Sequence, residues 1–408
     1  MLNLNIRNKC FVNMKDTDDN FVGIKCKDGD VKINFPMGFN LSNNDDDIRK
    51  DILLLINILE NNTGNKDSEF LGQIRQYEKT EFPIQAYIEI LRDFYNNGYY
   101  KELEVSYTVS KKGKINWNRT IKTQKPYIQD NKIYYLDFVT KKNTVNDDNL
   151  ITLIHEYCVY DSFRIIGWLF SKNMPKRPKV KFNEKLFISV ITEKLTSTFN
   201  DRRRKLFNNM LAIIKSKGDS ESKVNYKYGT YRFEYVWEKM IDNIFGIENK
   251  SDYFPKTTWM IDGNTYNNAS LEPDTIMVSD NNVYVLDAKY YKFGVTTKPS
   301  HLPESTSINK QITYGEYIDE EKKFREWHGE NMKVYNAFIM PFDSQEGKFK
   351  TEEKMRHIGH AISSWKSGAK EYESIQGILI DIKYLMKKSI QQDEKEIEKL
   401  AKLIREMI

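Results

Sequence analysis

Two acidic residues and a lysine border apolar stretches in the segment 271–291, LEPDTIMVSDNNVYVLDAKYY. Asp274 precedes TIMV, whereas Asp287 and Lys289 follow VYVL. The 12 residues between Asp274 and Asp287 are enough for two short strands and the turn SDNN. In such a hairpin both carboxylates return to the same end of the sheet. Asp287 and Lys289 are two residues apart, so their side chains point to one face of the strand.

These groups suit the hydrolysis of a phosphodiester bond. Mg²⁺ activates water and neutralises phosphate charge, and it prefers one or two carboxylates together with waters and phosphate oxygens. Lys289 can orient the attacking water, and Ala288 can offer its main-chain carbonyl to the metal. Pro273 suits the entrance to a strand. The spacing alone leaves a second interpretation open, in which these are ordinary surface charges at strand ends.

A similar pattern occurs nearer the C-terminus, where Asp381 and Lys383 follow the apolar stretch GILI. This second pattern lacks a Pro-Asp partner at hairpin spacing. We expect it to be a strand end that emerges into solvent.

Two neighbouring helices carry polar residues that can complete the site. The helix expected over 228–246 has Glu234 and Glu238 one turn apart, beside Trp237. The helix expected over 307–321 carries Lys310, Gln311 and Tyr314. Each set is also compatible with a solvated polar helix face.

The elements that position these residues follow from hydrophobic periodicity. Before residue 217 the pattern predicts a hairpin around Asp28-Gly29-Asp30, strands within 103–140, and helices over 45–62, 82–98, 148–171 and 183–217. The polar stretch KSKGDSESK (215–223) predicts a linker. The pattern after it predicts helices over 228–246, 307–321 and 389–408, the hairpin, and strands over 334–342 and 375–385. We therefore predict an α/β fold with a mixed sheet flanked by helices at 218–408, preceded by an α+β region at 1–217.

Composition narrows the functional classes. The chain has 63 basic and 58 acidic residues, and this net charge of +5 permits contact with nucleic acid without requiring it. Its 3 cysteines are too few for a disulfide framework. The sequence shows no signal peptide, no apolar run long enough to span a membrane, and no P-loop, so we expect a cytoplasmic protein that does not itself hydrolyse a nucleotide. His357 and His360 are expected on an exposed helix face.

Four stretches, in the order FEYVWE, LEPDTIMV, VYVLDAKYY and INKQITYGEY, resemble the PD-(D/E)xK nuclease superfamily. More closely, the chain resembles the LlaJI-like restriction endonucleases, which are related to the McrC nuclease subunit. The stretches FPMGF, GKINWNRTI and TFNDRRRKLF extend the resemblance toward the N-terminus.

The resemblance implies a Mg²⁺-dependent endonuclease that cleaves double-stranded DNA, with one or two metal ions. It implies Asp274 and Asp287 as metal ligands, Lys289 as the catalytic lysine, Glu234 as the helix carboxylate and Gln311 as a supporting residue. Of the two helix carboxylates, we expect Glu234 to reach the metal, because Glu238 continues into an acidic row toward Asp242.

The resemblance also implies a partner, a separate McrB-like AAA+ GTPase. The region 1–217 would contact that partner or DNA, and the basic turn within SKKGKINWNRTIK (110–122) is the candidate contact. The basic stretch 201–205, DRRRK, is either a solvated helix end or a DNA-facing patch. Two other functions remain open: a self-sufficient type II enzyme in which 1–217 reads DNA, and a non-catalytic activator of the GTPase.

Overall fold

The computed structural model describes residues 6–62, 82–145, 149–170, 174–217, 225–389 and 391–406. The chain forms two compact units: unit 1 combines Met1–Thr80 with Lys223–Ile408, and unit 2 is Glu81–Ser222. Most of the predicted linker, 218–223, lies outside the described residues. The units differ from the predicted division at 217, because the N-terminal residues cluster with the C-terminal half of the chain.

A four-stranded sheet explains why the N-terminal residues belong to unit 1. Its strand order is β1-β3-β2-β9, with bounds Cys10–Val12 (β1), Val22–Lys27 (β2), Asp30–Phe35 (β3) and Tyr226–Thr230 (β9). Strand β9 covers residues that we expected to begin a helix. Gly23 pairs with Gly229 between β2 and β9, and a Cβ on Gly23 would lie 2.1 Å from the Tyr228 carbonyl oxygen. Two facing glycines therefore allow these strands to approach.

The predicted hairpin belongs to a five-stranded mixed sheet with the order β12-β13-β14-β16-β15. The bounds are Thr275–Ser279 (β12), Asn282–Ala288 (β13), Val334–Phe342 (β14), Met355–Ile362 (β15) and Ser374–Asp381 (β16). Strands β13, β14 and β16 run parallel, while the two edge strands are antiparallel to their neighbours. His357 and His360 lie in edge strand β15 and not in the helix that we expected.

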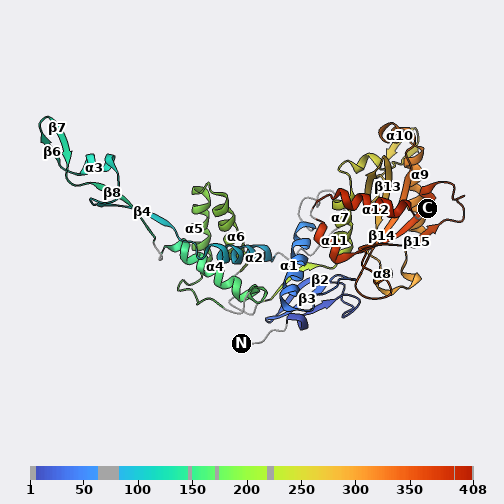
Figure 1. Cartoon of the computed structure of the whole chain (residues 1–408), viewed down its shortest axis with the longest axis horizontal. Helices are drawn as coiled ribbons and strands as arrows, with labels where there is room; N and C mark the ends of the chain where they lie inside the picture. The colour runs from blue at the N-terminus through green and yellow to red at the C-terminus, as the bar shows by residue number, and fades with distance from the viewer. Residues whose placement is uncertain are drawn as a thin grey trace. The chain divides into compact units, whose positions relative to one another are not determined.

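Helices cover both faces of this sheet (Figure 1). The helices of unit 1 are Asp45–Asn62 (α1), Phe233–Phe245 (α7), Phe293–Thr296 (α8), Ser305–Glu320 (α9), Lys322–His328 (α10), Ile382–Lys388 (α11) and Glu394–Arg405 (α12). Helix α9 packs on the face that carries Val283 and Val285. Helices α7 and α12 contact each other and the sheet. Residues 382–385, expected as strand, begin helix α11.

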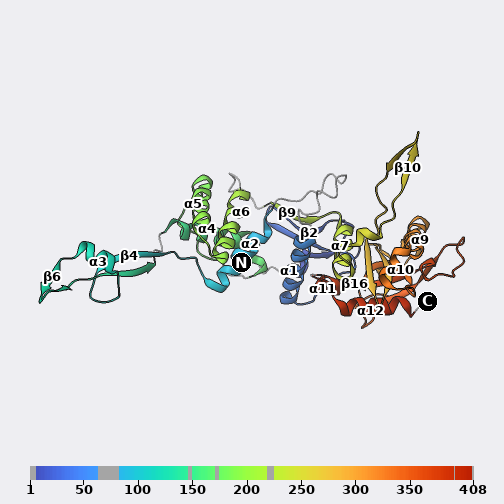
Figure 2. The same ribbon diagram turned by 90° about the horizontal axis from the view of Figure 1, so that it is seen from above.

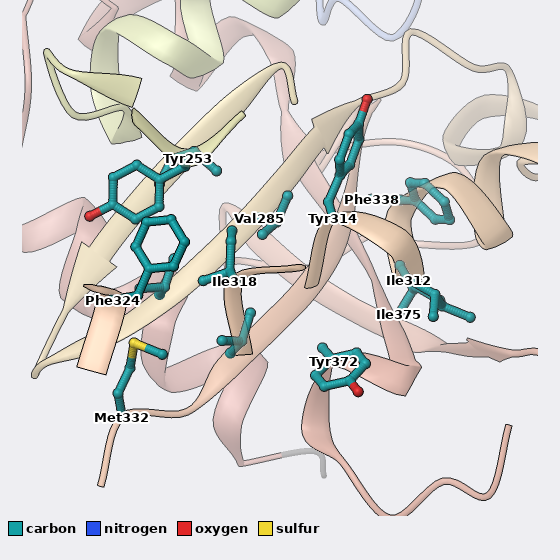
Figure 3. Close-up of a cluster of buried hydrophobic side chains, with 13 residues drawn as sticks. Tyr253, Val285, Ile312, Tyr314, Ile318, Phe324, Met332, Phe338, Tyr372 and Ile375 are labelled. Atoms are coloured by element: carbon teal, nitrogen blue, oxygen red, sulfur yellow. The ribbon is translucent and has the colours of Figure 1, made fainter. Parts of the chain in front are cut away.

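The core between α9 and the sheet is shown in Figure 3. Val285 of β13 and Phe338 of β14 belong to one buried cluster with Ile312 and Ile318 of α9. Tyr253 and Phe324 stack at one end of that cluster, with their ring centroids 4.7 Å apart. Because β13 alternates its side chains between two faces, Asp287 follows Val283 and Val285 onto the face covered by α9.

Unit 2 contains a helical part and a strand-rich part. The helices are Ile84–Asn97 (α2), Leu150–Ile166 (α4), Glu184–Ser197 (α5) and Asp201–Lys217 (α6). The single long helix predicted over 183–217 is therefore two helices, separated at Thr198–Asn200. Within the basic stretch 201–205, Arg202 pairs with Asp93 and Lys205 with Glu89 on α2.

The strand-rich part of unit 2 spans residues 103–145. Its elements are Leu103–Val109 (β4), Lys114–Ile115 (β5), Trp117–Thr123 (α3), Pro126–Gln129 (β6), Lys132–Tyr135 (β7) and Val139–Val145 (β8). They form a three-stranded sheet, β4-β8-β5, and a two-stranded sheet, β6-β7. Among the helices that the structure describes, none has the length and apolar character needed to cross a membrane.

Candidate active site

The hairpin β12–β13 brings Asp274 and Asp287 to one end of the central sheet. Thr275, the first residue of β12, pairs with Leu286 of β13, so the flanking carboxylates are neighbours. The main-chain N–H of Ala288 donates to Asp274 Oδ2 at 2.9 Å. Asp280 and Asn281 form the tight turn with φ of 49° and 60°, a conformation that Asp and Asn tolerate. The expected return of the two carboxylates to one edge is confirmed.

Lys289 extends from the same strand end toward Asp287. Its main-chain N–H donates to the Ile339 carbonyl at 2.8 Å, which continues the pairing of β13 with β14. Its Nζ lies 2.8 Å from Asp287 Oδ2. Asp287 is only 8% exposed, so this ion pair lies mostly inside the protein. The predicted arrangement of Asp287 and Lys289 on one face is therefore present.

The third carboxylate near this pair belongs to Glu238 of α7. The charges of Lys289 and Asp287 both act on the Glu238 carboxyl, whereas Glu234 is paired with Arg232. Helix α7 is fixed in rotation by Trp237, whose Nε1–H donates to the Ile339 carbonyl at 3.2 Å. This orientation favours Glu238, and not the expected Glu234, as the helix carboxylate of the site.

Burial and nearby carboxylates raise the pKa values of Asp274 and Glu238. For Asp274, burial is the largest cause, and the Asp287 charge and a hydrogen bond to Asp287 add to it, so its pKa lies well above 3.8. Burial raises the pKa of Glu238 to about 7, with Lys289 opposing the change. Burial alone would lower the pKa of Lys289, but the Asp287 carboxylate overrides it and raises that pKa. The site concentrates negative charge in a place where water stabilises it poorly.

Gln311 is a buried residue that fixes α9 to strand β13. Its Nε2 donates to the Val285 carbonyl at 2.7 Å and to Asn336 Oδ1 at 3.4 Å. The Asn336 amide in turn donates to the Tyr372 carbonyl at 2.6 Å. These bonds hold α9 against β13 at Val285 and against β14 at Asn336.

Two further lysines lie near the carboxylates, Lys250, which the sequence analysis did not single out, and Lys310 of α9. Lys250 Nζ donates to the Asp274 main-chain carbonyl at 2.7 Å and to Asp242 Oδ2 at 2.8 Å. Lys310 lies 5.5 Å from the Tyr314 ring centroid. Burial alone would lower the pKa of Lys310, but Tyr314 and the charges of Asp287 and Asp274 outweigh burial and raise it. Tyr314 donates to the Glu272 carbonyl at 3.2 Å. The signal for Lys310 in the sequence was the pattern K-Q-x-x-Y on the helix after the hairpin, whereas Lys250 belongs to no such pattern.

The donor set fits a hard divalent cation. Two adjacent carboxylates and a nearby third are oxygen ligands of the kind that Mg²⁺ accepts, with waters and substrate oxygens completing its shell. Within the described parts of the chain, no group of three or more His, Cys, Asp or Glu side chains is arranged to hold a metal ion by itself. Waters or phosphate oxygens must therefore supply part of any metal shell here.

Asp381 and Lys383 are structural, and the expectation of a solvated strand end is wrong. Asp381 is 5% exposed. It accepts from the main-chain N–H of Tyr384 at 2.8 Å, which caps α11, and from the Ser344 hydroxyl. Lys383 pairs with buried Asp51 of α1 at 2.8 Å and donates to the Asn40 carbonyl at 2.9 Å. This second D-x-K joins the N-terminal residues to the central sheet.

The structure thus defines a mixed α/β protein with an acidic, lysine-containing cluster at one end of its central sheet. The chain matches the family model of the LlaJI restriction endonuclease over residues 21–358, and it belongs to that family. A search of curated proteins gives no significant match.

Among solved structures, the chain is similar to one described as a refined half-complex from a tetradecameric assembly of Thermococcus gammatolerans McrB AAA+ hexamers with bound McrC. The identity is 16%, the TM-score is 0.38, and the match covers 91% of this chain and 82% of that chain.

Proposed function

We propose that this chain is the DNA-cleaving subunit of a bacterial restriction system of the McrBC/LlaJI type, active against phage. It hydrolyses phosphodiester bonds in double-stranded DNA with Mg²⁺ at a PD-(D/E)xK site. The observation that carries this proposal is the convergence of Asp274, Asp287 and Lys289 at one end of β12 and β13. Membership of a restriction endonuclease family supports it.

In this proposal Asp274 and Asp287 hold the metal, with Glu238 as the nearby third carboxylate. Mg²⁺, when bound, lowers the pKa of water and neutralises charge on the phosphate. Lys289 orients the attacking water and offsets negative charge on the scissile phosphate. Lys250 fixes the main chain of Asp274, and Gln311 fixes β13 at Val285. These two contacts limit the movement of the reactive groups, as efficient catalysis requires.

We further propose a separate McrB-like AAA+ GTPase as the partner, with the strand-rich part of unit 2 as its contact. This part exposes large apolar side chains to solvent, which is unfavourable for a surface without a partner. They are Trp117, Ile121, Ile128 and Ile133, which are 53%, 59%, 76% and 65% exposed. Lys111, Lys112 and Lys114 add positive charge at the turn before α3. Such a surface, apolar with a basic border, suits a protein partner. A DNA-phosphate contact would depend mainly on the lysines.

Plasmid cleavage separates this proposal from its two alternatives. The full-length protein is incubated with Mg²⁺ and supercoiled plasmid, with and without the GTPase and GTP. We expect cleavage that needs both the GTPase and GTP. Cleavage by the isolated chain at one sequence would indicate a self-sufficient enzyme. Stimulation of GTP hydrolysis without any cleavage would indicate a non-catalytic activator.

A further inference from the structure

An exposed hairpin precedes Asp274 in the chain and contributes no residue to the candidate active site. Strands β10 (Thr258–Ile261) and β11 (Asn264–Asn267) form a separate two-stranded sheet. Figure 2 shows it projecting from the body of unit 1. All 14 residues from 256 to 269 are exposed. A lone two-stranded hairpin is marginally stable in water. Contact with a binding partner would therefore stabilise a hairpin of this kind.

The surface of this hairpin is unusually poor in charge. Of the residues 256–269, only Lys256 and Asp262 are charged, although 30% of the whole chain is charged. One face carries the cross-strand pair Trp259 and Tyr266, which are 63% and 53% exposed. The other face carries Met260, 81% exposed, opposite Thr265. A flat protein surface would cover one face only, whereas the walls of a groove contact both.

The base of the hairpin is fixed beside the carboxylates. Asn268 N–H donates to the Thr257 carbonyl at 2.9 Å, and Leu271 N–H donates to the Pro255 carbonyl at 3.0 Å. Asp274 follows three residues after Leu271. A strand rises about 3.3 Å per residue, so the tip lies within a few nanometres of the site. A duplex cleaved there passes within reach of this hairpin.

The charge of the neighbouring segment also suits DNA. Residues 288–303, which continue from β13, include Lys289, Lys292 and Lys298 and no acidic residue. Phosphates are attracted to such a segment. The hairpin, whose only charged residues are Lys256 and Asp262, complements the bases of the duplex, because base edges offer neutral donors, neutral acceptors and methyl groups.

We propose that β10–β11 enters a groove of the DNA duplex next to the cleavage site. The major groove admits a two-stranded β-ribbon. In this arrangement Asn264, Thr265 and Asn267 contact base edges, while Trp259 and Met260 contact thymine methyl groups in the groove. The hairpin thereby contributes to the choice of DNA sequence. This inference rests on the proposed function, since it deepens the substrate contact of the same site.

The test compares DNA binding by hairpin variants of the full-length protein in an Asp287→Asn background, which prevents cleavage during the measurement. Trp259→Ala combined with Met260→Ala should weaken binding to a mixed-sequence duplex by at least about tenfold. The dependence of binding on salt should stay unchanged, because no phosphate contact is lost. Trp365→Ala is the matched control. Trp365 is also 63% exposed, but it follows β15 at the opposite edge of the sheet.

Asn264→Ala with Thr265→Ala should change which sites the cleavage-competent protein prefers, as read by sequencing of the cut ends. If the Trp259→Ala/Met260→Ala variant binds DNA as tightly as its parent while the wild-type chain still cleaves DNA, this inference is overturned and the proposed function is not. Loss of co-purification with the GTPase while DNA binding is normal would also overturn it, in favour of a protein contact. A wild-type chain that cleaves no DNA, with or without the GTPase, would instead overturn the proposed function.

Discussion

At the scale of single residues, the orientation of α7 favours Glu238 over Glu234 as the helix carboxylate of the proposed site. Glu234 is paired with Arg232, whereas Glu238 is half-buried and lies within the field of Asp287 and Lys289. The sequence predicted Asp274, Asp287 and Lys289 because strand alternation and hairpin length fix their positions. It could not choose between two glutamates one helical turn apart, since that choice depends on packing such as the Trp237 contact with Ile339.

Glu238→Gln should therefore reduce cleavage by about 10²-fold or more and raise the Mg²⁺ concentration needed for half-maximal rate. Glu234→Gln, the matched variant on the same helix, should stay within a few fold of the wild type. The measurement is the cleavage rate as a function of Mg²⁺ concentration for both variants. A normal Mg²⁺ response in Glu238→Gln together with an impaired one in Glu234→Gln would restore the assignment expected from the sequence.

At the scale of elements, the local sequence pattern did not predict the short strands β9 and β15. Strand β9 was expected as helix because its partner, β2, lies about 200 residues earlier in the chain. Strand β15 was missed because a bulge between His357 and Gly359 interrupts its alternation. The helices over 45–62 and 82–98 were predicted well because their apolar faces repeat over several turns. Long-range pairing therefore accounts for most of the differences.

Lys383→Ala tests the element-scale role of the second D-x-K. Lys383 contacts Asp51 of α1, and Asp51 is 4% exposed. Removing the lysine leaves a buried carboxylate with less compensation, so the free energy of unfolding should fall by about 3 kcal/mol. Lys387→Ala on the exposed side of the same helix should change it by less than about 0.5 kcal/mol. Denaturant unfolding measures both variants.

If Lys383→Ala unfolds like the wild type but cleaves no DNA, Lys383 acts in the reaction and the site has been placed at the wrong strand end. Lost cleavage that returns at low temperature, where the variant is folded, would agree with the structural role.

At the scale of the whole molecule, the chain forms two compact units. Composition and pattern placed a boundary near 217, but they could not show that residues 6–62 fold with the C-terminal half. That association depends on β9 in the N-terminal sheet and on the contact of Lys383 with Asp51. Neither the pairing of β9 nor the contact of Lys383 with Asp51 can be predicted from local sequence periodicity.

Unit 2 should lose stability in mild acid because of His155. This residue is 0% exposed, and its Nδ1 accepts from the Tyr100 N–H at 2.9 Å. Burial lowers its pKa from 6.5 to about 4. The unfolded chain therefore binds a proton that the folded unit does not, and stability falls as the pH falls from 6.5 toward 4. The full loss is about 3 kcal/mol.

Hydrogen exchange of α4 peptides, corrected for the intrinsic effect of pH, measures this loss. His155→Leu should flatten the pH dependence, even though the variant differs in overall stability. Asp161 on the same helix has a raised pKa, caused mainly by burial, and acts in the opposite direction at lower pH. An unchanged pH dependence in His155→Leu would assign the acid sensitivity to another group.

The most direct test of the central claim is plasmid cleavage by Asp287→Asn and Lys289→Ala under the conditions in which the wild type is active. Both residues lie at the strand end where the carboxylates converge, and their ion pair is only 2.8 Å long. We expect each variant to lose cleavage by at least about 10³-fold while it still assembles with the GTPase and keeps a cooperative melting transition. Cleavage at near wild-type rates by either variant would contradict the assignment of this site to DNA hydrolysis.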